Sequence, residues 1–396
     1  MRKIQTKTHK FLNKSAQNPN KNTQIPQKVG PQSIPKNKTL KDSRRRRPSG
    51  YIKCRSRVCC TSKKTKYPGM AEAEVTEVED CRGVLKVYSD GSIVRSPQPG
   101  FPLPYADDGR VEYKDVVFDQ TLGLQLRLYI TTEALASQSQ IPIFVYFHGG
   151  GYCIGSRTWG NFHNYCLRLA LALNALVIAP DYRVGPEHRL PASLDDGFAA
   201  IRWIRTQTEA IDGSAATADP WMACHADFAR VYVSGDSAGG GIAYHVSIRA
   251  PLEPSWGRVQ IKGYILLMAF FGGEERTPSE ATCPSDAFLN RDLNDRYWRL
   301  SLPVGANRDH PVCNPFGPGA PDLKELALPA VLVIAGGCDL LRDREIEYAE
   351  KLKEYGKQVE LAVYEGEQHG FFTLTPNSSA SKDLMDRIIG FMKAHQ

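Results

Sequence analysis

Residues 231–241 read VYVSGDSAGGG and give the clearest indication of the fold of this chain. A run of β-branched and aromatic residues breaks at Gly235, and the residues that follow Gly241, IAYHVSIRA, have helical character. One serine between glycines at a strand-to-helix corner is typical of a nucleophile elbow, because the strained turn leaves no room for side chains beside it. The pattern predicts that Ser237 stands above a sheet, at a helix N-terminus whose N–H groups stabilise negative charge. An ordinary glycine-rich turn fits the same five residues, so the interpretation needs partners elsewhere in the chain.

On both sides of this corner, from residue 111 onward, strand-like runs alternate with helical segments. The predicted strands are VVF (116–118), LQLRLYI (124–130), IPIFVYF (141–147), ALVIAP (175–180), RVYVSG (230–235), YILLMAF (264–270), AVLVIAG (330–336) and VELAVYE (359–365). The predicted helices lie near 161–173, 192–210, 238–249, 342–356 and 380–394. Several strands are apolar on both faces, as parallel strands covered by helices are. The alternation predicts a doubly wound α/β fold with a mostly parallel central sheet and helices on both faces.

Two regions do not fit the alternation. They are residues 70–105 and residues 272–315, and the second contains a predicted helix around RDLNDRYWRL. Insertions of this kind usually cover the carboxyl edge of a sheet, where open α/β sheets bind ligands. We therefore expect both regions to form a cap over the site.

A nucleophilic serine needs a histidine base and a carboxylate that orients the histidine. His369 follows the last predicted strand, which places it at the carboxyl edge of the sheet. Asp339 comes just after the preceding strand, whereas Asp343 stands at the start of a helix, where an acid can simply favour the helix N-terminus. The order Ser237, Asp339, His369 is that of α/β-hydrolases. These residues predict a catalytic triad.

The motif His148-Gly149-Gly150-Gly151 ends the predicted strand IPIFVYF. Glycines at this place let backbone N–H groups approach a substrate oxygen, as an oxyanion hole requires. A glycine-rich turn alone would carry little weight. Together with the elbow, a post-strand aspartate and a post-strand histidine in the required order, it indicates acyl-transfer chemistry.

Five motifs carry a resemblance to plant carboxylesterases of the hormone-sensitive-lipase-like class. They are HGGGYCIGSR (148–157), DYRVGPEHRLPA (181–192), GDSAGG (235–240), GGCDLLRD (336–343) and EQHGF (367–371). The chain resembles this family from about residue 75 to its end. The resemblance implies an α/β-hydrolase fold with a cap built partly by the N-terminal region.

The resemblance also implies roles for individual residues. Ser237 would be the nucleophile, His369 the general base and acid, and Asp339 its orienting carboxylate. The remaining implied roles belong to the oxyanion hole, formed by N–H groups of Gly149, Gly150 and Ala238, and to substrate binding by Gly151 and Tyr152. His148 would brace the glycine loop, and the DYRVGPEHRLPA stretch would hold it in place. Tyr152, Phe271, Tyr297 and Trp298 are candidates for an apolar pocket wall, although aromatics near a sheet edge more often belong to the core.

Three functions remain open within this family. The preferred one is a serine carboxylesterase acting on small esters, lactones or hormone-like molecules of the strigolactone type. Gibberellin receptors look similar but lack the catalytic histidine, and His369 is present here. A dehydratase would use a similar site for elimination.

Charge is distributed very unevenly along the 396 residues, whose net charge is +7. Residues 1–69 contain 20 of the 50 lysines and arginines and a single acid, Asp42, so the remainder is acidic. This segment is polar and without periodicity, and we expect it to be disordered. It would be either an organelle transit peptide or an overextended start before Met70, and the run Arg44–Arg47 is compatible with a nuclear address. The basic balance therefore gives no reason to expect nucleic-acid binding.

The ten cysteines are scattered and form no C-x-x-C pair. This pattern favours a reducing compartment such as the cytoplasm and no structural zinc. The longest apolar run, 264–271, is far shorter than the roughly 20 residues of a membrane span. We expect a 70–396 hydrolase domain that needs no metal or other cofactor and binds a small ester, while its oligomeric state stays open.

Overall fold

The computed structural model describes residues 74–96, 107–137, 139–213 and 217–396. The basic segment 1–69, for which the sequence predicts disorder, lies outside these residues, and so does the domain start expected at Met70.

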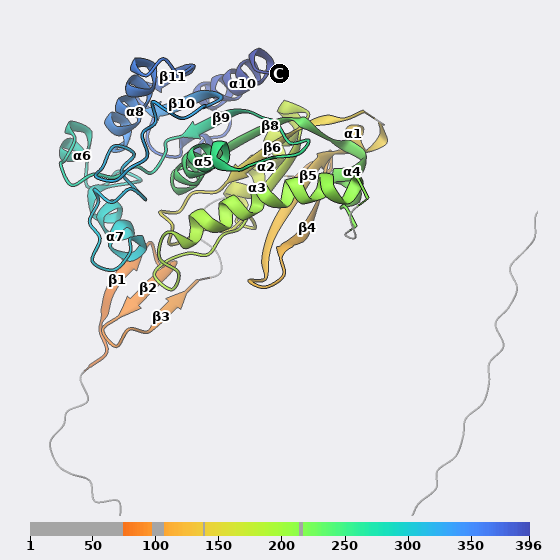
Figure 1. The fold of residues 1–396 in the computed structure, drawn as a ribbon. Helices are drawn as coiled ribbons and strands as arrows, with labels where there is room; N and C mark the ends of the chain where they lie inside the picture. The colour runs from red at the N-terminus through yellow and green to blue at the C-terminus, as the bar shows by residue number, and fades with distance from the viewer. Residues whose placement is uncertain (1–73, 97–106, 138, 214–216) are drawn as a thin grey trace, which may run out of the picture. The chain divides into compact units, whose positions relative to one another are not determined.

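One eight-stranded sheet organises the described chain, with its strands in the order β11-β10-β9-β8-β6-β7-β5-β4 (Figure 1). The strands are β4 (Val111–Asp119), β5 (Leu124–Thr131), β6 (Ile141–Phe147), β7 (Leu176–Pro180), β8 (Ala226–Asp236), β9 (Ile261–Leu267), β10 (Ala330–Gly336) and β11 (Val359–Tyr364). Strands β7, β6, β8, β9, β10 and β11 pair in parallel, whereas β4 pairs with β5, and β5 with β7, in antiparallel fashion. The predicted α/β class with a mostly parallel sheet is confirmed.

Helices cover both faces of this sheet. The long ones are α2 (Gly160–Leu173), α3 (Ala192–Ile211), α5 (Ala238–Arg249), α8 (Arg342–Glu354) and α10 (Ser379–Ala394). Successive side chains of a strand point to opposite faces. Tyr146 of β6 meets Tyr165 of α2, with 5.1 Å between ring centroids, and α2 packs on α10. Phe147, which follows Tyr146 in β6, points to the other face. A Cβ on Gly197 of α3 would lie 3.5 Å from the Phe147 ring, so α3 and its neighbour α5 cover that face.

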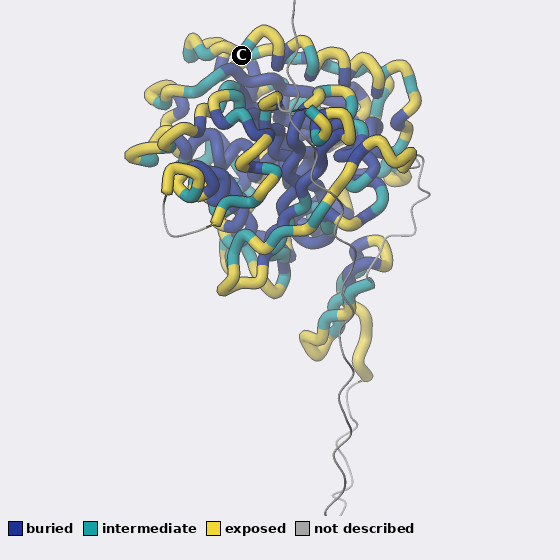
Figure 2. Tube along the Cα trace, turned by 90° about the vertical axis from the view of Figure 1, so that its right-hand side faces the viewer, coloured by how far each residue is buried: buried dark blue, intermediate teal, exposed yellow. Residues whose placement is uncertain are grey.

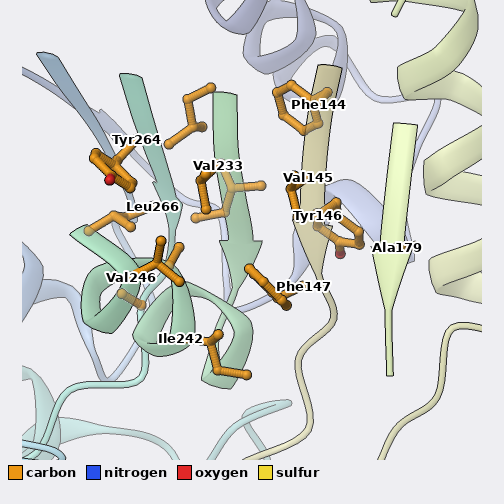
Figure 3. Packing of buried hydrophobic residues seen from close by; sticks show 14 of the residues in the cluster. Phe144, Val145, Tyr146, Phe147, Ala179, Val233, Ile242, Val246, Tyr264 and Leu266 are labelled. Carbon is orange, nitrogen blue, oxygen red and sulfur yellow. The ribbon is translucent and has the colours of Figure 1, made fainter. Parts of the chain in front are cut away.

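The core lies between these layers. Figure 3 shows Phe144, Val145, Tyr146 and Phe147 of β6 beside Val233 of β8 and the α5 residue Ile242. All of these side chains are nearly or completely buried, and Figure 2 shows the buried segments running through the interior with exposed turns around them. Because β6, β7 and β10 are buried along almost their whole length, their sequences are apolar at nearly every position.

A separate three-stranded antiparallel sheet precedes the large one in the chain. It consists of β1 (Glu77–Cys81), β2 (Leu85–Tyr88) and β3 (Ile93–Arg95). Strand β1 contacts α7 (Arg291–Ser301), where Glu79 accepts hydrogen bonds from Arg296 at 2.9 Å and Arg299 at 3.0 Å. Figure 1 shows the small sheet next to α7. The two irregular regions of the sequence therefore meet, as the cap prediction requires.

The remaining helices are short. They are α1 (Thr132–Ala136), α4 (Pro220–His225), α6 (Pro278–Thr282), α9 (Phe371–Leu374) and the 3₁₀ turn Ala250–Leu252. All eight predicted strands, the five long helices and the helix around RDLNDRYWRL are confirmed, with bounds that differ from the prediction by up to five residues. The small sheet and the short helices were not predicted.

Three further observations concern the described residues only. Their seven cysteines form no disulfide. They contain no cluster of His, Cys, Asp or Glu arranged to hold a metal ion. None of their helices is long and apolar enough to cross a membrane.

Candidate active site

Ser237 occupies the corner between β8 and α5 with φ +53° and ψ −120°. A non-glycine residue at positive φ is strained, and such strain is concentrated at functional sites. The space beside the serine explains the glycine two residues later, because a Cβ on Gly239 would lie 2.0 Å from the carbonyl oxygen of Phe147. The N–H of Ser237 donates to the Leu267 carbonyl at 2.9 Å and fixes the turn to β9. The local structure is therefore the predicted elbow.

His369 and Asp339 form a buried pair, with 2.6 Å between Nδ1 of the histidine and Oδ2 of the aspartate. The two residues are 7% and 3% exposed. Asp339 follows β10 and His369 follows β11, so both stand at the carboxyl edge of the sheet. The other aspartate oxygen accepts a hydrogen bond from the N–H of Leu341 at 3.1 Å. The carboxylate thus engages Nδ1 of His369 and leaves Nε2 as the ring nitrogen outside this hydrogen bond.

The alternative acid, Asp343, points elsewhere. Its Oδ2 accepts the backbone N–H of Ser279 at 2.7 Å, and Arg342 donates to its other oxygen at 2.9 Å. Asp343 therefore anchors the start of α6 and does not contact His369. Ser237 and His369 line the same pocket, so the structure brings together the three residues that the sequence predicts as a triad.

The glycine loop after β6 lies beside the serine. Gly150 and Gly151 line the pocket, and among the described residues their N–H groups donate no hydrogen bond. Ala238 is the first residue of α5, so its N–H lacks an intrahelical partner as well. The backbone of Gly149 interacts instead with the carboxyl group of Asp236, whose pKa it lowers. Three N–H groups, from Gly150, Gly151 and Ala238, thus remain available to a substrate oxygen.

Asp236 is itself an unusual neighbour of the serine. Burial raises the pKa of this carboxyl, although hydrogen bonds from the hydroxyl of Tyr146, at 2.5 Å, and from the Gly149 backbone act in the opposite direction. Its carboxylate ties β6 to the elbow and holds the start of the glycine loop.

The DYRVGPEHRLPA segment supports the loop from behind. The hydroxyl of Tyr182 donates to the carbonyl of His148 at 2.6 Å, and the two rings stack with 4.4 Å between centroids. Asp181 accepts the N–H of Arg157 at 2.7 Å, which closes the loop on its far side. These contacts support a structural role for the segment and a bracing role for His148.

The pocket above Ser237 contains a cavity of about 70 Å³. Most of its wall is apolar, formed by Ile154, Trp159, Phe162, Phe288, Leu289, Leu293 and Tyr297. Phe288, Leu289, Leu293 and Tyr297 belong to the 272–315 insertion, which therefore closes the site. Gly151, at φ +58°, allows the approach of Tyr297, because a Cβ there would lie 2.2 Å from the Cγ of that ring.

Of the four aromatic candidates, Tyr297 lies in this wall and the other three pack elsewhere. Tyr152 is 1% exposed, and its ring packs near Phe270 and Trp298, with 6.1 and 5.9 Å between centroids. Phe271 meets Tyr244 of α5 in the core. A substrate contact of Gly151 agrees with its place in the pocket lining, whereas one from the side chain of Tyr152 stays a prediction without a contact to support it.

Several pocket residues are not predicted from the sequence, and three of them differ most in their origin. Arg82 stands in the turn between β1 and β2, Asn161 in the first turn of α2, and Phe288 in the insertion. None belongs to a motif, and only the meeting of distant segments brings them to the site.

Comparison with known proteins agrees with this geometry. Residues 144–373 match the model of the alpha/beta hydrolase fold family. The chain is 35% identical over 332 residues to probable carboxylesterase 6 of Arabidopsis thaliana, covering 82% of this chain and 93% of that protein. It is 36% identical to the 2-hydroxyisoflavanone dehydratase of Glycyrrhiza echinata (78% and 94% covered) and 35% identical to the gibberellin receptor GID1 of Oryza sativa subsp. japonica (71% and 80% covered).

Among solved structures, a Pyrobaculum calidifontis esterase superimposes with a TM-score of 0.59 at 26% identity, covering 72% of this chain and 86% of the esterase. With the family match, the esterase relatives and the esterase fold in agreement, the chain belongs to the α/β-hydrolase family, within its plant carboxylesterase branch, and is a carboxylic ester hydrolase.

Proposed function

We propose that the protein is a serine carboxylesterase that works through an acyl-enzyme on Ser237. The observation that carries this proposal is the buried His369–Asp339 pair, 2.6 Å apart, in the same pocket as a serine at a strained elbow. A pure binding site has no need of a histidine held by a buried carboxylate.

The reaction has two halves. His369 Nε2 takes the proton of the Ser237 hydroxyl as its oxygen attacks the ester carbonyl carbon. Asp339 keeps the histidine in the required tautomer and stabilises the imidazolium that forms. The imidazolium then gives its proton to the leaving alcohol oxygen, and a water molecule, activated by the same histidine, releases the acid and restores the serine.

Negative charge develops on the carbonyl oxygen in both halves. The N–H groups of Gly150, Gly151 and Ala238 would receive it, because they lie at the site without other partners, whereas the Gly149 N–H is engaged by Asp236. The set implied by the family resemblance contains Gly149, whereas the set proposed here contains Gly151 in its place. The N-terminal end of α5 adds a favourable field at the same oxygen.

The size of the cavity supports small substrates. At roughly 10–15 Å³ for each water-sized atom, a cavity of about 70 Å³ holds about five to seven non-hydrogen atoms. A short acyl or alcohol group fits this space, while the rest of the ester would lie outside it. The scattered cysteines of the sequence support a location of the protein in the cytoplasm.

Covalent labelling tests the proposal directly. A fluorophosphonate should react with Ser237, found by mass spectrometry of the labelled peptide, and Ser237→Ala should lower the hydrolysis of p-nitrophenyl acetate by on the order of 10⁴-fold or more. His369→Ala should nearly abolish the labelling without unfolding the protein. An unreactive serine in folded protein that binds a ligand equally well after His369→Ala would instead favour a receptor. Elimination of water from a hydroxyisoflavanone, without ester hydrolysis, would favour a dehydratase.

A further inference from the structure

The lining of the active-site pocket contains groups that favour negative charge. They are the guanidinium of Arg82, the first turn of α2, and the side chain of Asn161 in that turn. None of them takes part in the acyl-transfer steps described above, so each needs an explanation of its own.

Among the described residues that line this pocket, Arg82 is the one side chain with a permanent positive charge. It stands at φ +60° in the turn between β1 and β2, with its guanidinium carbon 4.0 Å from the centre of the Phe288 ring. Its neighbours on the cap, Arg296 and Arg299, share the carboxylate of Glu79. Within the described part of the chain, Arg82 forms no ion pair, although it hydrogen-bonds Tyr297. A cation in the lining of an apolar pocket attracts an anionic partner.

The N-terminus of α2 opens onto the same pocket. Its N-cap, Trp159, makes no side-chain cap hydrogen bond, and the first turn contains no acid. In the described structure the backbone N–H groups of Gly160, Asn161 and Phe162 have no hydrogen-bond partner. Trp159, Asn161 and Phe162 all line the pocket. Unpaired N–H groups at the positive end of a 14-residue helix favour an anion.

Asn161 supplies the observation that points to a ligand. The residue is 9% exposed, and its side-chain oxygen is buried without a hydrogen-bond partner. Buried amides are almost always paired, because an unpaired one loses its bonds to water without replacement. A half-turn of the amide exchanges its oxygen and nitrogen, so the group can also donate to a ligand oxygen.

Among the described residues that line the pocket, the one carboxyl group is that of Asp236, which is engaged by Tyr146 and Gly149. We infer that the group bound in this pocket carries a carboxylate, so that the substrate is a half-ester of a short dicarboxylic acid. This inference rests on the proposed esterase function. Arg82 and the first turn of α2, with Asn161, would bind the distal carboxylate while Ser237 attacks the ester carbonyl. Beyond that carbonyl, a succinyl group has five non-hydrogen atoms, which agrees with the volume of the cavity.

A pair of matched esters tests the inference. Monomethyl succinate carries the distal carboxylate, and methyl levulinate replaces it by a neutral acetyl group of nearly the same shape. Hydrolysis is followed in a pH-stat at neutral pH. We expect the full-length protein to favour monomethyl succinate by about tenfold in kcat/KM, mainly through KM, since a charge-assisted bond to a non-reacting group contributes binding.

Three variants at two positions, Arg82 and Asn161, identify the residues. Arg82→Met keeps the length of the side chain and removes its charge, so the ratio of the two kcat/KM values should fall about tenfold, whereas Arg82→Lys should retain most of it. Asn161→Asp is isosteric and places a negative charge at the helix N-terminus, so it should lower the same ratio through repulsion. If Arg82 served only to pack on Phe288, Arg82→Met would lower kcat/KM equally for both esters and leave their ratio unchanged. That result would overturn the inference.

The outcomes separate the inference from the function on which it rests. Hydrolysis of methyl levulinate that depends on Ser237, together with no preference for the charged ester, would refute the carboxylate subsite and leave the esterase intact. Hydrolysis of neither ester, with an unlabelled Ser237, would refute both.

Discussion

Glu345 offers a sharp test of the electrostatics behind the triad. It lies in α8, is 0% exposed, and neither of its carboxylate oxygens has a hydrogen-bond partner in the described structure. Burial raises its pKa well above the ordinary value of 4.5, and the negative charge of Asp339 raises it further. The neighbouring cation, Arg344, is occupied by Glu280 at 2.5 Å. Glu345 in the folded protein therefore keeps its proton at pH values at which an exposed glutamate has already lost it.

The sign and size of the effect on stability follow from this difference. Below about pH 4.5 both the folded and the unfolded chain carry the proton, and the carboxyl adds no pH dependence. Above it, the unfolded chain ionises at Glu345 while the folded chain does not, so stability falls as the pH rises. The loss is about 1.4 kcal/mol per pH unit, from roughly pH 5 until the folded-state pKa is reached. Glu345→Gln removes this loss, so its stability relative to the parent protein should increase with pH at the same rate.

Urea unfolding of both proteins at pH 5.0, 5.5, 6.0 and 6.5, followed by circular dichroism, measures the difference. With a urea m-value of about 3 kcal/mol/M, each pH unit should move the two midpoints apart by about 0.5 M. Glu347→Gln is the matched control, because Glu347 lies on the same helix, is exposed and, within the described residues, forms an ion pair with Lys351 alone. A Glu345→Gln difference that does not vary with pH would show that this carboxyl is ionised in the folded protein, and the reasoning would fail.

Three further predictions concern the site and its cap. Asp339→Asn should lower kcat on p-nitrophenyl acetate by on the order of 10²- to 10⁴-fold, whereas Asp343→Asn should leave kcat nearly unchanged; the reverse order would reassign the acid. Gly151→Ala should lower kcat by about 10²- to 10³-fold with little change in far-ultraviolet circular dichroism, because its Cβ would displace the ring of Tyr297 and the oxyanion donor with it. Glu79→Gln should destabilise the protein by at most about 1 kcal/mol in thermal unfolding, and the difference should shrink in 1 M salt, since the pair it breaks is partly exposed; a loss that persists in salt would point to packing instead.

The sequence predicts the large sheet well because its strands are apolar nearly throughout and separate into runs bounded by glycine, proline and polar residues. The small sheet escapes prediction for the opposite reason. Strand β3 has three residues and β2 has four, and neither is long enough to show an alternation. Helices such as α9, with four residues, are too short to show a helical period.

The candidate site divides in the same way. The triad residues stand directly after strands, so their place at the sheet edge follows from the pattern of strands alone. Pocket residues do not have this property. The sequence places Tyr152 next to the oxyanion loop but cannot tell that its ring turns into the core towards Phe270 and Trp298. Arg82 and Phe288 are separated by more than two hundred residues. Only the folded cap brings the guanidinium carbon of Arg82 to within 4.0 Å of the centre of the Phe288 ring.

The contact between β1 and α7 also determines when during synthesis the protein can act. Glu79 and Arg296 are 217 positions apart, and the pocket is lined by residues from Arg82 to Thr373. A ribosome that has completed the elbow has made Ser237 but neither the histidine nor the α7 wall. At roughly 5–20 residues per second, the later residues take several more seconds to appear. A chain released early from translation would therefore present a serine without hydrolytic power, and ester cleavage begins only when the first and last parts of the domain have met.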